Sequence, residues 1–280
     1  MRRRPLLVVL ALVLVVAACG DDGGDDGGTT SSTAPGPAPT ITTPSSVPAT
    51  DVSALVFFAR EDKVATAGRA VEPPAVARGA LEALLAGPDD FEAGLGMTSA
   101  IPEGTRLLDV AVDGGVATVD LSGEFLADLE GPVALGVAQI VFTLTQFPTV
   151  DRVTILIEGV GTASVGLDAV PVAEVDRSDF EAETPLVLVE QPAPGAAVTS
   201  PVAVSGLSNT FEANVLYEVT DASGNVVDDG FTTATSGTGT WGTFTFSTDL
   251  EPGDVVITVF QESAEDGSRT DLYPVPVHVG

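Results

Sequence analysis

The side chains that most often carry out chemistry are scarce in this chain of 280 residues, which has one cysteine, Cys19, and one histidine, His278. A single cysteine forms no disulfide within a chain, and this pair is too small to supply the ligands of a zinc site. A Ser-His-Asp triad would have to use His278, which alternates with Val277 and Val279 on a predicted strand and should face solvent. We therefore predict no catalytic residues, no metal ligands and no cofactor, and a protein that is not an enzyme.

Two further features could take part in chemistry, and each has a simpler structural explanation. Asp120-Leu-Ser122 places an acid beside a nucleophile, but no histidine or lysine lies nearby in the sequence to activate the serine. Capping of a strand end through local backbone hydrogen bonds accounts for both side chains. Arg106 and Arg152 could recognise an anionic ligand such as a cell-wall carboxylate, or each could pair with a neighbouring carboxylate of the chain.

The charge of the chain limits its partners. It has 40 Asp and Glu against 11 Lys and Arg, for a formal net charge of −29. Such a chain repels phosphate backbones, which argues against binding to DNA or RNA, and it is also repelled by an anionic membrane surface. The acidic loop residues Asp249, Glu251 and Asp254 could coordinate calcium, or they could form a solvated rim that keeps the protein soluble.

The first 18 residues have the features of a secretory signal peptide. Three arginines lie within Met1 to Arg4, and the apolar run from Pro5 to Ala18 would span only about 21 Å as a helix, too short for a hydrocarbon core of about 30 Å. Val16-Ala-Ala-Cys19 follows and resembles the lipobox of bacterial lipoproteins, in which Leu is more usual at the position of Val16. An ordinary secretory cleavage site with a coincidental cysteine is the alternative.

The lipobox resemblance implies that Cys19 carries diacylglycerol and becomes the new N-terminus. Two acyl chains anchor a protein stably where one is marginal, so the lipid would hold the protein against charge repulsion. Residues 20–50 consist mainly of Gly, Asp, Ser, Thr, Pro and Ala, and this composition is too polar to fold. We expect residues 19–50 to form a lipidated, flexible tether at the outer face of the cell membrane.

Hydrophobic periodicity predicts an α+β domain over residues 51–182. The order is strand, helix, hairpin, helix, strand, which indicates two helices packed on one mixed sheet. The predicted elements are a buried strand at Leu55 to Phe58, a helix from Val76 to Leu85, a hairpin of Arg106 to Val112 with Val116 to Leu121, a helix from Pro132 to Phe147 and a strand at Val153 to Ile157.

Residues 184–280 show no helical period and instead contain seven short β-rich runs separated by Gly, Pro, Asn and Asp. This is the pattern of an all-β immunoglobulin-like sandwich without the disulfide of antibody domains. The predicted strands are Leu186–Val189, Val202–Ser205, Val215–Thr220, Phe231–Thr235, Thr243–Ser247, Val255–Phe260 and Tyr273–Val279. The aromatic residues predicted for its core are Trp241 and Phe211, Phe231, Phe244, Phe246 and Phe260; exposure of Trp241 for binding is the alternative.

Both regions also resemble known families. The first contains Leu84-Leu-Ala-Gly-Pro88, Ala100-Ile-Pro-Glu-Gly-Thr105, Val116-Ala-Thr-Val-Asp-Leu-Ser122, Thr143-Leu-Thr-Gln-Phe-Pro148 and Val153 to Gly159, in the order seen in the GerMN domain of sporulation and germination proteins. The second contains Ser200-Pro201, Val204-Ser-Gly206, Phe211-Glu-Ala-Asn-Val215, Gly242 to Phe246 and Val259-Phe260, and it resembles Gmad2, an immunoglobulin-like domain that commonly follows GerMN. The GerMN resemblance implies an extracytoplasmic module similar to ring-building domains, with no established catalytic residues.

Taken together, these features predict a non-catalytic lipoprotein of the cell envelope that binds or assembles with an envelope protein or a cell-wall glycan. The families imply a role in sporulation, germination or envelope homeostasis. Two alternatives stay open, a peptidoglycan-active enzyme with paired carboxylates and a lipoprotein that captures a solute or metal. The Gly-, Ala- and Pro-rich composition is associated with GC-rich actinobacterial genomes.

Overall fold

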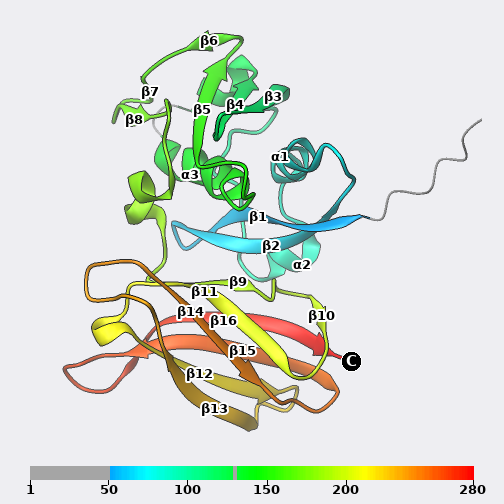
Figure 1. Cartoon of the computed structure of the whole chain (residues 1–280), viewed down its shortest axis with the longest axis vertical. Helices are drawn as coiled ribbons and strands as arrows, with labels where there is room; N and C mark the ends of the chain where they lie inside the picture. Colours follow the sequence, from blue (N-terminus) through cyan, green and yellow to red (C-terminus); the bar gives the residue numbers. More distant parts are fainter. Residues whose placement is uncertain (1–50, 129–130) are drawn as a thin grey trace, which may run out of the picture. The chain divides into compact units, whose positions relative to one another are not determined.

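The computed structural model describes residues 51–128 and 131–280, all within one compact unit (Figure 1). The predicted signal peptide, Cys19 and the predicted tether lie outside the described residues. We refer to residues 51–182 as the N-terminal domain and to residues 184–280 as the C-terminal domain. In the described ranges, no helix combines the length and apolar character needed to cross a membrane.

The N-terminal domain contains a two-stranded sheet, β1-β2, and a four-stranded sheet in the order β3-β4-β5-β6, in which β4 and β5 run parallel. A small two-stranded sheet, β7-β8, follows. The elements in chain order are β1 (Val52–Arg60), β2 (Lys63–Val71), α1 (Val76–Ala86), α2 (Asp90–Gly94), β3 (Leu107–Asp113), β4 (Val116–Leu121), η1 (Gly123–Leu126), α3 (Val133–Leu144), β5 (Arg152–Ile157), β6 (Val160–Gly161), β7 (Ser164–Val165), β8 (Val170–Pro171) and η2 (Arg177–Glu183).

The predicted helices, hairpin and strands of this domain are confirmed, within a few residues at their ends. The run from Leu55 to Phe58 forms the centre of β1 and is buried, because α1 and α3 pack against this strand. Phe57 contacts Phe142 of α3 with ring centroids 5.4 Å apart. β2 was not predicted from the sequence, because its three alanines and one glycine have little β-propensity; it becomes a strand through pairing with β1.

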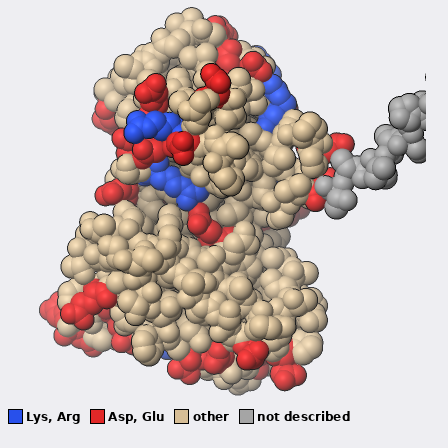
Figure 2. Space-filling view, viewed as in Figure 1, with Lys and Arg blue, Asp and Glu red and all other residues tan. Residues whose placement is uncertain are grey.

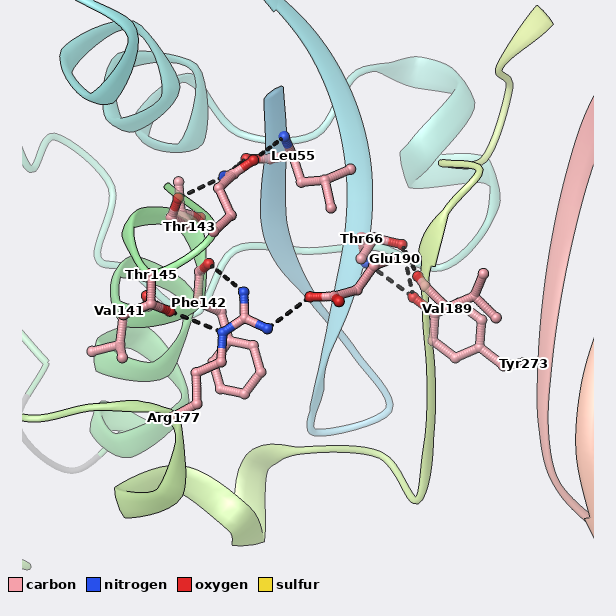
Figure 3. A network of polar contacts seen from close by, with 11 residues as sticks. Leu55, Thr66, Val141, Phe142, Thr143, Thr145, Arg177, Val189, Glu190 and Tyr273 are labelled. Atoms are coloured by element: carbon pink, nitrogen blue, oxygen red, sulfur yellow. Dashed lines mark hydrogen bonds and ion pairs between the residues drawn. The ribbon is translucent and has the colours of Figure 1, made fainter. Parts of the chain in front are cut away.

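The prediction of a single sheet is wrong, because the outer edge of β1 bonds mainly to side chains of α3 and of the turn after it instead of to a second long strand, as Figure 3 shows at Leu55. Three polar side chains lie along α3 and the turn after it. The Gln139 side chain donates to the carbonyl of Phe57 at 2.9 Å, and the Thr143 hydroxyl accepts from the Phe57 N–H at 3.1 Å. The Gln146 amide accepts from the N–H of Leu55 and donates to its carbonyl. Ala59, farther along the same edge, forms an isolated antiparallel bridge with Thr98. Together these bonds satisfy the strand edge, so no longer strand pairs there.

Replacing Gln139 with leucine is expected to lower the free energy of unfolding by about 2 kcal/mol, because it leaves buried backbone groups unpaired. The Gln139 side chain is fully buried and also accepts from the Ala100 N–H at 2.7 Å. Urea unfolding followed by circular dichroism would measure the change. The matched control is Gln191→Leu at an exposed position, and equal stability of the two variants would contradict the assigned role.

The C-terminal domain is a sandwich of a five-stranded sheet, β10-β16-β15-β12-β13, and a three-stranded sheet, β14-β11-β9 (Figure 1). All seven predicted strands are present, together with the two-residue β10, so the prediction of an immunoglobulin-like sandwich after an α+β domain is confirmed. The elements are β9 (Val187–Gln191), β10 (Ala197–Val198), β11 (Val202–Ser208), η3 (Phe211–Ala213), β12 (Asn214–Asp221), β13 (Val226–Thr233), β14 (Gly242–Thr248), β15 (Gly253–Glu262) and β16 (Arg269–Val279).

The strand β13 begins five residues before the predicted start at Phe231, within a segment whose acids and glycine suggest a turn. Gly230 is needed there, because a Cβ atom would lie 2.7 Å from the hydroxyl of Tyr217 on the neighbouring strand β12. Asp228 accepts a hydrogen bond from the Thr248 hydroxyl of β14. Contacts with two neighbouring strands therefore override the local turn preference of this sequence.

The aromatic core prediction for this domain is only partly right. Phe244 and Phe260 are buried, but Phe211 and Phe231 are 51% and 72% exposed. Phe246 and Trp241 are half-buried, so the predicted placement of Trp241 in the core is wrong. Small β-branched residues fill the space between the sheets instead, and because they alternate on strands they pack closely without large aromatic rings. The fully buried ones include Val204, Val215, Val219, Ile257, Val259 and Val275.

Candidate functional site

Asp120 and Ser122 lie at the end of β4 and bond to the backbone, as predicted, but the backbone groups lie 39 and 16 residues away and are not local. The Asp120 carboxylate accepts from the Gly159 N–H at 2.8 Å, and the Ser122 hydroxyl accepts from the Arg106 N–H at 2.9 Å. These bonds tie β4 to the segments beside it. Both side chains therefore cap strand ends.

Arg106 and Arg152, the two candidates for anion recognition, are each paired with a carboxylate of the chain. Arg106 lies 3.4 Å from Glu124, and Arg152 lies 3.9 Å from Asp176. Hydrogen bonds from Ser178 hold the pKa of Asp176 below its ordinary value, and the nearby Arg152 guanidinium lowers that pKa further. Of the two sequence-based alternatives, the structure supports pairing within the chain.

His278 faces solvent, as predicted, and its Nδ1 atom lies 2.7 Å from a carboxylate oxygen of Asp254. The imidazole and the carboxylate are 60% and 78% exposed, so solvent screens their interaction. In the described part of the chain, no three His, Cys, Asp or Glu side chains are grouped so that they could hold a metal ion.

The most extensive polar network involving both domains surrounds Arg177, on η2 shortly before the C-terminal domain (Figure 3). Its guanidinium donates to the Thr145 hydroxyl at 2.9 Å, to the carbonyl of Phe142 at 3.2 Å and to Glu190 of β9 at 2.7 Å. The same group lies 4.7 Å from the ring centroid of Phe142 and 5.3 Å from that of Phe57. One side chain thus connects α3, β1 and the C-terminal domain.

A second set of bonds joins β2 to the C-terminal domain beside this network (Figure 3). The hydroxyl of buried Tyr273 on β16 accepts from the Thr66 N–H at 2.9 Å and lies 3.1 Å from the Thr66 hydroxyl. The Thr66 hydroxyl donates to the carbonyl of Val189 at 2.8 Å, so the Tyr273 hydroxyl must donate in its contact with Thr66 Oγ1. The two domains are therefore held together by directional, buried hydrogen bonds.

An open groove with a volume of about 730 Å³ lies next to this junction. Arg60 and Lys63 from the β1-β2 turn line it together with Tyr273, Leu186 and Leu272. Neither this groove nor the role of Arg177 was predicted from the sequence. The residues that line the groove, and the partners of Arg177, come from distant parts of the chain. The one local feature that could have indicated the groove is the pair of basic residues, Arg60 and Lys63, on either side of Glu61-Asp62. We take the junction and its groove as the candidate functional site.

Two family models match the chain. A family described as "Sporulation and spore germination" matches residues 55–162, and Gmad2, described as "Immunoglobulin-like domain of bacterial spore germination", matches residues 186–268. No curated protein is similar enough to this chain to count as a match.

Several solved structures are also similar to this chain, at 22% sequence identity or less. The tandem GerMN domains of the sporulation protein GerM from Bacillus subtilis are 19% identical, with 71% of this chain and 61% of that chain covered and a TM-score of 0.40. The first GerMN domain of that protein is 22% identical, with 45% and 96% covered and a TM-score of 0.34. A putative lipoprotein from Clostridium perfringens is 18% identical, with 48% and 93% covered and a TM-score of 0.34. This chain therefore spans less than two thirds of the tandem GerMN protein. The assignment of the two domains to their families depends on the matches to the family models.

Proposed function

The chain carries a GerMN-type domain followed by a Gmad2 immunoglobulin-like domain, and we propose that it binds or assembles with other components of the cell envelope outside the cytoplasmic membrane. The descriptions of both families name sporulation or spore germination, and neither family is known as a catalytic domain. The chain is thus a sporulation-associated, non-catalytic module. The binding role and the location are the parts that we propose.

The observation that carries this proposal is the junction between the domains. Arg177 and Tyr273 each contribute to bonds between them, so the two surfaces keep one orientation. A protein built to recognise an extended or composite partner benefits from such preorganisation, because less freedom is lost on binding. Asp120 and Ser122 are engaged in capping, and Arg106 and Arg152 in ion pairs, which favours a binding role over a catalytic one.

Anchoring through Cys19 is the second part of the proposal. A thioether-linked diacylglycerol would hold the chain at the outer face of the membrane despite its net charge, which is −32 once residues 1–18 with their three arginines are removed. We propose that residues 20–50 then let the two domains reach partners above the membrane.

Replacing Cys19 with alanine is expected to move the protein from the membrane pellet to the soluble fraction or the medium, because no other cysteine can carry the lipid. Fractionation followed by mass spectrometry of the N-terminal peptide would measure both the location and the lipid. Cys19→Ser serves as a matched variant that keeps the size and polarity of the side chain. Wild-type protein with a free thiol, or with residues 1–18 uncleaved, would contradict the anchor.

The binding role can be tested by crosslinking in living cells that carry the tagged full chain, followed by purification and identification of the captured components. We expect an envelope protein or cell-wall material to be enriched with the wild-type chain and lost with Cys19→Ala, which changes only the location. Capture of neither class by the wild type would contradict the proposal. Digestion of purified cell wall by the protein would instead favour the enzyme alternative.

A further inference from the structure

Two of the basic side chains in the described residues lack a carboxylate partner, although acids greatly outnumber bases in this chain; Figure 2 shows the charged side chains on one face of the molecule. Six of the eight lie in ion pairs, namely Arg69, Arg78, Arg106, Arg152, Arg177 and Arg269. The other two are Arg60 and Lys63, and no carboxylate of the described residues lies within 4.0 Å of either. Both line the groove beside the domain junction.

The backbone places these two cations side by side. Arg60 and Lys63 are directly opposite each other at the end of β1 and β2, so their side chains leave the same face of the ribbon. A two-residue turn of Glu61 and Asp62 joins them, with φ angles of 51° and 61°, a left-handed conformation that costs energy for residues with a Cβ atom. Like charges directly opposite on paired strands also destabilise the sheet. The fold therefore holds two cations side by side, and a bound anion would be stabilised by both.

Both cationic groups keep hydrogen-bond donors free for a ligand. The Arg60 guanidinium lies over the Tyr273 ring, with its Cζ atom 4.4 Å from the ring centroid, and donates to no acceptor among the described residues. The ammonium group of Lys63 donates to the carbonyl of Ala182, which engages one of its three protons. The cation–π contact with Tyr273 holds the guanidinium in place and uses none of its N–H donors.

The rest of the groove restricts the ligand further. Leu186 and Leu272, 37% and 53% exposed, form an apolar part of its lining. Three carboxylates, Glu61, Glu181 and Asp271, also line it, and the last accepts from Gln261 at 2.7 Å. These acids would repel a doubly charged phosphate, but they suit a ligand that carries an amine as well as a single negative charge.

We propose that this groove binds a peptide through its terminal carboxylate, which Arg60 and Lys63 hold between them. The carboxylate accepts from the guanidinium and the ammonium group, an apolar side chain of the peptide packs on Leu186 and Leu272, and its free amine lies toward the acids. The site deepens the proposed binding function and rests on it. A stem peptide of the cell wall and the C-terminus of an envelope protein share this chemistry.

The test uses the full chain in mild detergent micelles and isothermal titration calorimetry with the tripeptide Ala-Leu-Ala. We expect the peptide with a free carboxylate to bind at least about tenfold more tightly than its C-terminal amide, since charge-assisted hydrogen bonds are lost in the amide. This comparison leaves the protein unchanged. The variants Lys63→Gln and Arg60→Gln/Lys63→Gln should bind the free peptide about tenfold more weakly or worse, with folding checked by thermal melting. Arg106→Gln, which removes a paired and exposed arginine outside the groove, should bind as the wild type does.

Equal binding of peptide and amide, no binding of the tripeptide, or unchanged binding by the double variant would each overturn the site. Purified muropeptides and peptides copied from envelope-protein C-termini then form two further arms, and tighter binding in one arm identifies the source. The crosslinking experiment with the double variant separates the two proposals. If that variant still captures the wild-type partner, the site is wrong and the binding function stands. If the wild type captures nothing, the binding function itself is wrong.

Discussion

Replacing Arg177 with methionine is expected to lower the free energy of unfolding by about 3 kcal/mol and to uncouple the two domains. The substitution removes bonds to Glu190, to the Thr145 hydroxyl and to the carbonyl of Phe142. Breaking a fully buried ion pair costs about 3–5 kcal/mol, and this pair is about a quarter exposed, so we expect the lower end of that range. Methionine retains much of the packing against Phe57 and Phe142, which isolates the polar contribution.

Calorimetric unfolding measures this effect. The wild type should unfold in one transition, whereas Arg177→Met should show two, because the domains no longer stabilise each other. Glu190→Gln and the double variant Arg177→Met/Glu190→Gln complete a double-mutant cycle. Its coupling energy measures the contribution of the Arg177–Glu190 ion pair alone. Arg106→Met removes an exposed pair at 3.4 Å and is the matched control, with an expected loss of less than about 1 kcal/mol. A single unchanged transition for Arg177→Met would show that the junction does not depend on this side chain.

Replacing Gly206 with alanine is expected to have the largest effect of any substitution considered, a loss of about 4 kcal/mol or more. Gly206 lies in β11, the central strand of its sheet, where the register with β9 shifts. A Cβ atom there would lie 2.0 Å from the carbonyl oxygen of Leu188 and 3.0 Å from the ring of Phe244. Since backbone of the adjacent strand occupies the space, β9 must move, and losses of this size come from such overpacking of a core.

Urea unfolding of Gly206→Ala would give the loss, or the variant would fail to fold. Gly94→Ala at the end of α2 is the control, since nothing lies within 4 Å of the added Cβ atom there and alanine favours helix. A stability for Gly206→Ala within about 1 kcal/mol of the control would mean that β9 and β11 lie farther apart than described. Gly206 belongs to the Val204-Ser-Gly206 motif by which the sequence resembles Gmad2, and the close approach of β9 explains the glycine in it.

Much of the fold was predictable because it depends on local patterns. The stripe of apolar residues in α3 and the alternation in the strands of the C-terminal domain both follow from the repeat of the backbone, which needs only neighbouring residues. The Gly114-Gly115 turn is similar: both glycines have positive φ angles, 55° and 87°, as a two-residue hairpin requires. The prediction that Asp120 and Ser122 cap strand ends was also right, although their backbone partners, Gly159 and Arg106, lie 39 and 16 residues away and are not the local groups that the sequence suggested.

The candidate site was not predictable in the same way. Arg106 and Arg152 were the arginines proposed from the sequence for anion recognition, yet both are paired, whereas Arg60 and Lys63 are not. Which basic residue meets a carboxylate depends on contacts between residues far apart in the chain. Arg269, for example, bonds to Glu218, 51 residues away. No local pattern carries that information.

The sequence by itself determined the order of the predicted elements, the resemblance to two families and the excess of acid over base, because all three depend on composition, motifs and local periodicity. Only the tertiary structure decided that α3 completes the edge of β1 and that Tyr273 bonds to Thr66 across 207 residues. It also decided that two unpaired cations share one groove. The physical reason is that hydrogen bonds and ion pairs act over a few ångströms in space, whatever the separation along the chain.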